Sequence, residues 1–245
     1  TIQQWGDGFW GLLTFSMQML LVLVTGFMLA CTPLVKSLLE RLASLAKSPG
    51  SAIVLVTLVS LIASWINWGF GLVVGALFAK ALARKVSVDY RLLVASAYSG
   101  FIVWHGGLAG SVPLTIATPG HFSEAQIGVI GTGETIFSGF NLLLLAIMFV
   151  IIPLVNRLML PPESESIIVD SAKLQDDAFP SPTNERPADK LENSKVLGLL
   201  VGFAGLAYLT NYFVSGGGLN LNIVNTLFLF LAIVLHGTPR NVLHS

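Results

Sequence analysis

Residues 64–71 read SWINWGFG and interrupt a long uncharged apolar run. Asn67 carries an amide that can donate and accept hydrogen bonds, and Gly69 and Gly71 permit tight backbone geometry. A turn at membrane depth is tolerated only where it is buried in protein or lines an aqueous cavity. The free N–H groups of a helix that starts there would suit an anion. The stretch predicts an ion or anion site; the alternative is a kinked helix whose Asn67 bonds to a neighbouring helix.

A second stretch, residues 104–120, reads WHGGLAGSVPLTIATPG. Three glycines precede Pro113, which breaks a helix internally but fits the first turn of a new one. We predict a discontinuous helix, unwound near residues 106–111, of the kind that holds substrate or coupling ions in transporters. Close helix packing at the glycines is the alternative. The predicted binding residues of both stretches are Asn67, Gly69, Gly71, Gly106, Gly107, Gly110, Ser111 and Thr115.

Two ionisable residues are further candidates. His105 lies beside the predicted break, where it could carry a proton, contact substrate or simply make a structural hydrogen bond. Glu134 could line an outer vestibule or be an exposed interfacial residue. No zinc, phosphate-loop or nucleophile-elbow motif is found, so we predict no catalytic residue, no metal site and no cofactor. The single cysteine, Cys31, excludes an internal disulfide.

The composition indicates the elements that must position these residues. Charged residues make up 11% of the chain, about half the usual fraction of a soluble domain, and the mean hydropathy is +0.79. A helix needs roughly 20 residues to cross the hydrocarbon layer. The chain is therefore predicted to be an all-α integral membrane protein, a polytopic bundle. Its long uncharged runs cover residues 8–35, 48–79, 92–123, 135–156 and 196–239.

We predict a membrane domain over residues 1–160, a flexible cytoplasmic linker over 161–195, and two further spans over 196–214 and 220–236. The linker prediction rests on its prolines, its many charges and its lack of an apolar period. Helix 33–47 has one apolar and one polar face, so it should lie in the membrane interface. The expected elements of the membrane domain are a span (9–30), the interfacial helix (33–47), a re-entrant hairpin (51–84), a broken helix (91–120) and a span (138–160).

The hairpin follows from length and charge. Thirty-two uncharged residues, 48–79, would make a straight helix of about 48 Å, too long for the bilayer. A fold at Asn67 gives arms of about 15 and 12 residues that reach roughly midplane. Both flanks are basic, with Lys47 on one side and Arg84 on the other, so both should be cytoplasmic. With that topology, all thirteen Lys and Arg residues fall on the cytoplasmic side.

The chain resembles the bacterial short-chain fatty acid transporter family along nearly its whole length, least in the linker. The resemblance rests on the segments WGDGFW (5–10), INWGFGLVVGA (66–76), ATPG (117–120) and SGFN (138–141). It implies a carrier of acetoacetate or butyrate in the inner membrane. Family members are longer, so this chain would be an N-terminal portion without the second half. By analogy with the ion-transporter superfamily, the order of arm helix, hairpin and broken helix implies one half of an inverted repeat.

The predicted function is secondary active transport of short-chain monocarboxylates. The coupling ion would be Na⁺, held by carbonyls of the broken helix, or H⁺, carried by a group such as His105. The expected partners are the substrate, the lipid bilayer, the second half of the transporter and, as an option, another copy in a homodimer; nucleic acid is not expected. The alternatives are a channel or scaffold subunit and an intramembrane enzyme that uses His105 and Glu134.

Overall fold

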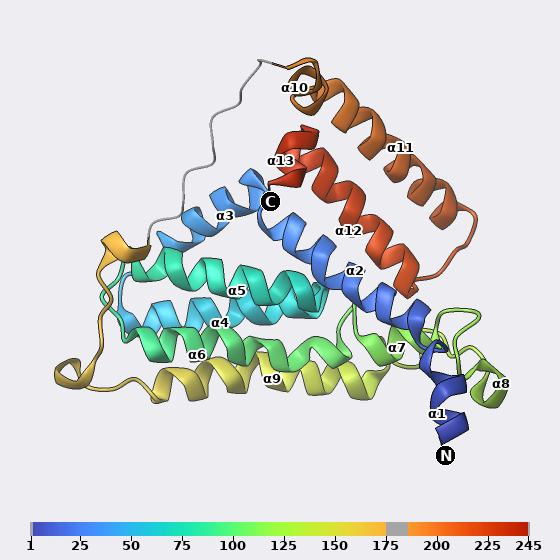
Figure 1. The fold of residues 1–245 in the computed structure, drawn as a ribbon. Helices are drawn as coiled ribbons and strands as arrows, with labels where there is room; N and C mark the ends of the chain where they lie inside the picture. The colour runs from blue at the N-terminus through green and yellow to red at the C-terminus, as the bar shows by residue number, and fades with distance from the viewer. Residues whose placement is uncertain (1, 175–185, 245) are drawn as a thin grey trace.

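The computed structural model describes residues 2–174 and 186–244, and these two ranges contain helices and no strand (Figure 1). Five helical stretches are long and apolar enough to cross a bilayer. The predicted all-α polytopic membrane fold is therefore confirmed. The α-helices are α1 (Ile2–Phe9), α2 (Leu13–Ala30), α3 (Pro33–Ala43), α4 (Pro49–Ile66), α5 (Trp68–Ala83), α6 (Tyr90–Ser99), α7 (Ser111–Ile116), α8 (Glu124–Ile127), α9 (Gly139–Leu158), α10 (Pro187–Glu192), α11 (Lys195–Val214), α12 (Leu221–His236) and α13 (Pro239–Leu243). The 3₁₀ helices are η1 (Gly100–Gly106), η2 (Glu163–Glu165) and η3 (Ser171–Leu174).

Helices α4 and α5 form a hairpin joined at Asn67. Ser48 and Ser51 make a capping box at the start of α4, and Pro49 occupies the first turn, where its missing N–H costs nothing. Asn67 has an extended backbone, with φ −157° and ψ 127°, so it ends α4 and caps α5 at once. The two arms have 18 and 16 residues, which is longer than the sequence analysis predicted.

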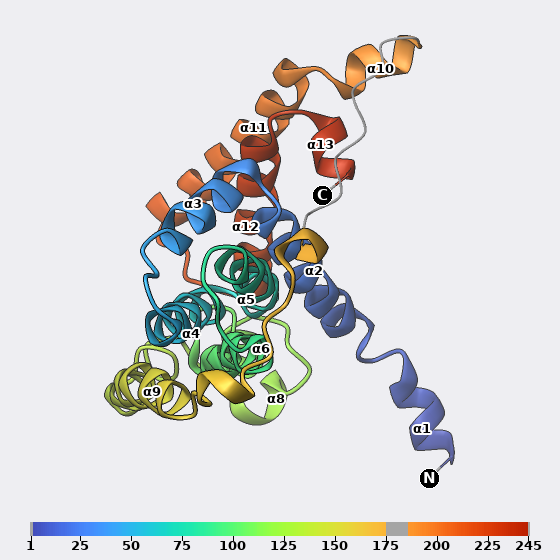
Figure 2. The same cartoon turned by 90° about the vertical axis from the view of Figure 1, so that its left-hand side faces the viewer.

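The hairpin lies at the centre of the bundle. α9 packs against α4, and α6 packs against both arms, so four helices run side by side (Figures 1 and 2). The buried residues between them include Ile53 and Val56 of α4 and Phe78 and Leu82 of α5. On the other side of α5 lies α2, which also contacts α12, and α11 packs on α12. The tip of the hairpin is thereby enclosed by other helices.

After α6 the chain continues as a 3₁₀ helix and then leaves helical structure. Gly100 begins the 3₁₀ helix η1 at a point where a Cβ atom would lie 2.6 Å from the side chain of Ser60. A 3₁₀ helix has three residues per turn, so every third side chain is aligned. Phe101 and Trp104 of η1 accordingly stack with ring centroids 5.5 Å apart, and Tyr98, in the last turn of α6, stacks on Phe101 at 5.9 Å. After Gly106 the chain is not helical again until α7 begins at Ser111.

Large apolar side chains cover the outer helices of the bundle. On α9, Phe140 is 79% exposed and Val150 is 67% exposed, and on α11 Val196 and Leu200 are similarly exposed. Contact of this apolar surface with water is unfavourable, whereas contact with lipid tails is not. The outward faces of α9 and α11 therefore suit the hydrocarbon layer.

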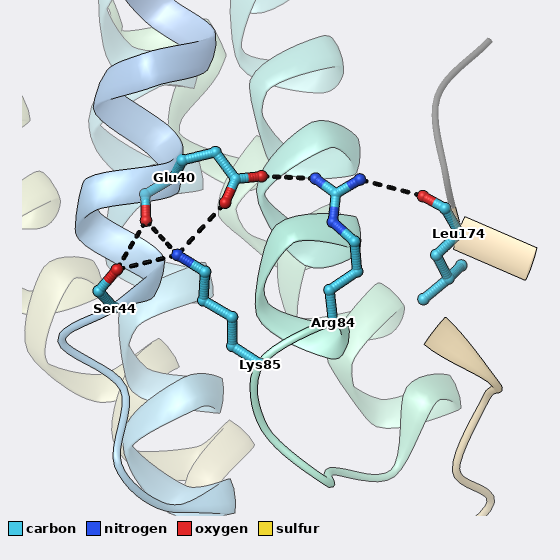
Figure 3. Close-up of polar contacts among 5 residues, drawn as sticks. All are labelled: Glu40, Ser44, Arg84, Lys85 and Leu174. Atoms are coloured by element: carbon cyan, nitrogen blue, oxygen red, sulfur yellow. Dashed lines mark hydrogen bonds and ion pairs between the residues drawn. The ribbon is translucent and has the colours of Figure 1, made fainter. Parts of the chain in front are cut away.

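An ion-pair cluster ties α3 to the base of the hairpin (Figure 3). The carboxylate of Glu40 accepts from Arg84 at 2.5 Å and lies 3.2 Å from the Lys85 ammonium. Lys85 also donates to the Ser44 hydroxyl at 2.9 Å, and Arg84 donates to the carbonyl of Leu174 at 3.1 Å. We call this region, where α3 meets the C-terminus of α5, the basic end. Because Glu40 is 43% exposed, each pair adds little stability, but together they show that both hairpin flanks lie at one end.

The first part of the predicted linker also packs at the basic end. The backbone N–H of Ile167 donates to the Asp89 carboxylate at 2.8 Å, and its carbonyl accepts from the N–H of Tyr90 at 2.9 Å. Arg91 donates to the carbonyl of Glu165 at 3.1 Å. These contacts hold the segment near the start of α6. Residues 175–185 of the linker lie outside the described residues.

Asp89 should give this region a measurable pH dependence. Its side chain is 2% exposed, and hydrogen bonds from Arg91 and from two backbone N–H groups hold its pKa well below the usual range. Folding therefore favours the carboxylate, so its contribution is complete above the unfolded pKa of about 3.9 and is lost as the pH falls below that value. We expect Asp89→Asn to lower stability by roughly 1–2 kcal/mol at pH 7.

Thermal unfolding of both proteins at pH 7 and pH 3 would check the Asp89 prediction. The difference in Tm between wild type and Asp89→Asn should shrink at the lower pH, because there the unfolded wild-type chain binds a proton at Asp89 that the folded protein does not bind. An equal difference at both pH values would contradict it.

Candidate functional site

The candidate site is the hairpin tip, residues 64–71. Asn67 is completely buried, and its Oδ1 accepts a hydrogen bond from the N–H of Phe70 at 3.0 Å. This bond caps α5 in the manner usual for asparagine. Gly71 packs so closely on Ser64 that a Cβ atom would overlap the serine side chain. The three residues predicted at the tip, Asn67, Gly69 and Gly71, are all buried there.

Four buried polar atoms at the tip have no hydrogen-bond partner among the described residues. They are the Nδ2 of Asn67, the hydroxyl of Ser64, and the indole nitrogens of Trp65 and Trp68. A buried polar group without a partner costs about 1–3 kcal/mol, and most proteins avoid such groups. Three of the four are N–H donors and the fourth can donate or accept. The tip therefore gathers unused donors within one turn on either side of Asn67.

Helix α2 covers the tip from one side. A Cβ atom at Gly26 would lie 2.5 Å from the Phe70 nitrogen and 2.8 Å from Asn67 Oδ1. A Cβ atom at Gly69 would in turn lie 2.8 Å from the carbonyl oxygen of Val22. The two glycines thus allow the backbones of α2 and α5 to approach directly. Asn67 and Gly69 are buried beneath this contact, whereas Trp68 and Phe70 remain partly exposed.

The break after η1 meets the tip from another side. The N–H of Leu108 donates to the carbonyl of Trp65 at 2.6 Å, and Gly107 has no room for a Cβ atom against that same carbonyl. Asn141, in the first turn of α9, donates to the carbonyl of Gly106 at 3.0 Å and so holds the preceding turn. The two stretches that the sequence analysis singled out are therefore in direct backbone contact.

The structure separates the other predicted residues from this contact. Ser111 and Thr115 are in α7, where they line a hollow together with Phe15 and Phe122. Gly110 packs against the carbonyl of His105, 2.6 Å from where its Cβ would lie. The predicted residues thus fall into two groups, one at the tip and one along α7.

The two ionisable candidates are at the surface of the described chain. His105 is exposed, and its ring lies over that of Trp104 with the centroids 3.7 Å apart. Glu134 is exposed in the loop before α9. Neither residue is buried beside Asn67.

Several residues that build the tip were not predicted from the sequence. Ser64, Trp65 and Trp68 lie inside the quoted motif, and their polar atoms were the available signal. Asn141 was visible as an amide near the start of an apolar run. Gly26 gave no signal, because a glycine in an apolar helix shows its role only when the opposing backbone is known.

The sequence matches the family model described as short chain fatty acid transporter over residues 1–245. A protein of Escherichia coli (strain K12) named "Putative short-chain fatty acid transporter" is 46% identical over 243 residues, which cover 97% of this chain and 55% of that protein. A protein of Haemophilus influenzae with the same name is 42% identical, with 97% and 56% covered. This chain therefore spans about half the length of these relatives. No solved structure matches it. On these matches, the chain belongs to the short-chain fatty acid transporter family.

Proposed function

We propose that this chain forms part of a secondary active transporter of short-chain monocarboxylates, such as acetoacetate or butyrate, and that the hairpin tip binds the carboxylate. The observation that carries the proposal is the set of unused donors around Asn67. A substrate carboxylate could accept hydrogen bonds from the Asn67 amide and the indole N–H groups of Trp65 and Trp68. The family and the names of the relatives support the substrate class.

The chemistry of the tip suits a small anion that must be released again. An isolated carboxylate pays a large free-energy penalty when it leaves water, unless hydrogen bonds replace its hydration. Hydrogen bonds to charged groups contribute about 1.5–3 kcal/mol each, and the N-terminus of α5 adds a favourable dipole. Because these donors are neutral, the site without substrate would not contain a buried positive charge. Such a site can bind the anion without trapping it.

The proposed topology follows the charge distribution. The hairpin would enter the membrane from the cytoplasmic side of the inner membrane and return to it, with the basic end in the cytoplasm. The hydrogen bonds of Arg84 and Lys85 to Glu40 and its neighbours support one common side for both flanks. The chain would act as one half of an inverted repeat, either with a second half of the same protein or in a homodimer.

Transport would require α2 to move relative to the hairpin. Gly26 and Gly69 bring the two backbones together over the first turn of α5, so substrate could reach Asn67 only after this contact opens. A rocking or elevator-like movement of the hairpin against α2 would open it alternately to each side. In this proposal the arrangement described above is the closed state.

The coupling ion is proposed to be Na⁺ or H⁺. Carbonyl groups of the break, such as that of Gly106, offer oxygen ligands for Na⁺, whereas His105 could carry a proton. An uptake experiment can distinguish the two ions. The intact protein that contains this chain is reconstituted in vesicles, and either a Na⁺ or an H⁺ gradient is imposed. Labelled butyrate should accumulate above its external concentration when one of the two gradients is imposed.

The same experiment separates the proposal from its rivals. Uptake should saturate with butyrate and should stop when both gradients are abolished. Butyrate flux that only follows its own gradient, without saturation, would indicate a channel. Turnover of ester or peptide substrates by the purified protein would indicate an intramembrane enzyme. Either result would overturn secondary active transport.

A further inference from the structure

A cavity of about 230 Å³ lies at the opposite end of the bundle from the basic end. We call it the far-end cavity. It opens between the N-terminal part of α2, the loop that follows α7 and the start of α12, which lie close together (Figure 1). Its walls are about half polar and half apolar. Six of the residues that line it are Thr14, Phe15, Gln18, Thr118, Phe122 and Asn222.

Hydrogen bonds among α2, α12 and the loop after α7 hold the polar wall together. The Gln18 side chain of α2 donates to the Oδ1 of Asn222 at 2.7 Å, and the Nδ2 of Asn225 donates to the backbone carbonyl of Gln18 at 3.0 Å. The hydroxyl of Thr118 accepts from the N–H of Leu221 at 3.2 Å, which joins the loop after α7 to α12. Three separate segments are therefore fixed around one hollow.

The apolar wall is an aromatic pair. Phe122 meets Phe15 edge to face, with centroids 6.1 Å apart and an angle of 78° between the rings. His121 folds the loop that carries Phe122: its Nδ1 accepts from the N–H of Ser123 at 3.2 Å, and its Nε2 lies 3.0 Å from the carbonyl of Gly128. Phe122 is 62% exposed, so replacing its side chain should leave the packed core intact.

The two walls fit a small amphiphilic anion. On one side, the Thr14 hydroxyl and the amide groups of Gln18 and Asn222 can donate to a carboxylate, and on the other side the phenyl rings can cover a short alkyl chain. Asn222 lies in the first turn of the 16-residue helix α12, whose positive dipole end favours an anion. The carboxylate of Glu124, the acid on the same loop, accepts from the backbone N–H of Gly120. This bond fixes the position of the Glu124 carboxylate beside Gly120, which also lines the cavity, and leaves its charge unchanged.

One face of α2 connects the cavity to the hairpin tip. Gln18, Val22 and Gly26 are spaced four residues apart, so they follow one another along the helix. Gln18 lines the cavity, and Gly26 covers Asn67. Eight residues of helix correspond to about 12 Å. A ligand in the cavity would therefore be about two helical turns from the tip.

We infer that the far-end cavity is a first binding station, which takes up a short-chain monocarboxylate before the hairpin tip receives it. This inference rests on the proposed function, because it assigns the same substrate class to a second site. The station would set the affinity for external substrate, whereas the tip would set translocation. Substitutions at Asn67 and in the cavity should therefore change different kinetic quantities.

Uptake kinetics of the intact protein test the station first. Phe122→Ala removes half of the aromatic wall, and Thr14→Val replaces the hydroxyl by a methyl group of similar size. Both should raise the KM for labelled butyrate about three- to tenfold and leave the maximal rate unchanged, because only initial binding is weakened. Phe140→Ala, an exposed phenylalanine on α9, is the matched control and should behave as wild type. An unchanged KM in both cavity variants would overturn the station.

A binding measurement separates failure of the station from failure of transport. Saturation-transfer NMR of butyrate with the purified intact protein needs no translocation. In Asn67→Ser protein, the butyrate signal should persist, and when Phe122→Ala is added it should need about three- to tenfold more butyrate to reach the same intensity. Loss of the signal in Asn67→Ser alone, or the same butyrate dependence in the double variant, would overturn the station. Retained, Phe122-dependent binding without any uptake by wild type would instead contradict the proposed function.

Discussion

Asn67→Ser should reduce uptake of labelled butyrate by about tenfold or more while the protein still inserts and folds. Serine is a good N-cap, so a side-chain oxygen can still accept from the N–H of Phe70. The change removes Nδ2, the unused amide donor of the buried tip. Loss of one hydrogen bond to a carboxylate, about 1.5–3 kcal/mol, corresponds to at least a tenfold loss of affinity. The measurement is the initial rate of uptake by vesicles that contain equal amounts of protein.

The control for this prediction is Asn241→Ala. Asn241 is an exposed asparagine of α13, and its amide donates to the carbonyl of His236 rather than to the hairpin. It should transport as wild type. Wild-type uptake by Asn67→Ser, with the same thermal stability, would remove the tip from the substrate site.

Gly107→Ala should prevent the break from docking on the hairpin and should destabilise the protein strongly. The added Cβ would overlap the carbonyl of Trp65, which is backbone and cannot rotate away. The hydrogen bond from Leu108 to that carbonyl would be lost with the contact. Overpacking typically costs 1–3 kcal/mol, and an unsatisfied buried carbonyl adds to it. We expect a loss of several kcal/mol, seen as aggregation or as a much lower Tm.

Gly139→Ala is the matched control for the packing prediction. Gly139 is in the first turn of α9, and a Cβ atom there would meet nothing within 4 Å. Alanine also has the higher helix propensity, so the control should be neutral or slightly stabilising. Size-exclusion chromatography of the detergent-solubilised proteins after heating gives the readout. Equal profiles for the two variants would show that the break does not depend on close contact with Trp65.

Local chemistry made the turn at Asn67 and the break before Ser111 predictable. An amide between two apolar runs, followed by two glycines, is a poor helix interior but a good N-cap. Pro113 requires the start of a helix, and α7 indeed begins two residues before it. These residues reveal their structure because the cause acts within a few positions of the chain.

Features that depend on contacts between distant segments could not be predicted. The change to a 3₁₀ helix at Gly100 accompanies a hydrogen bond from the Ser60 hydroxyl to the carbonyl of Ala97, 37 residues away. Gly26 covers the tip because the path of α2 brings it there. The separation of Ser111 and Thr115 from the tip follows from docking of the chain on Trp65, which no local pattern encodes.

The central claim is that the donors at the hairpin tip bind the carboxylate of the substrate. Solid-state NMR can test it through dipolar coupling between ¹³C-carboxylate butyrate and ¹⁵N-labelled tryptophan in the intact protein. We predict coupling to indole nitrogens that disappears when Trp65 and Trp68 are both replaced by phenylalanine. Coupling that survives this replacement, or its absence from wild type at saturating butyrate, would contradict the claim.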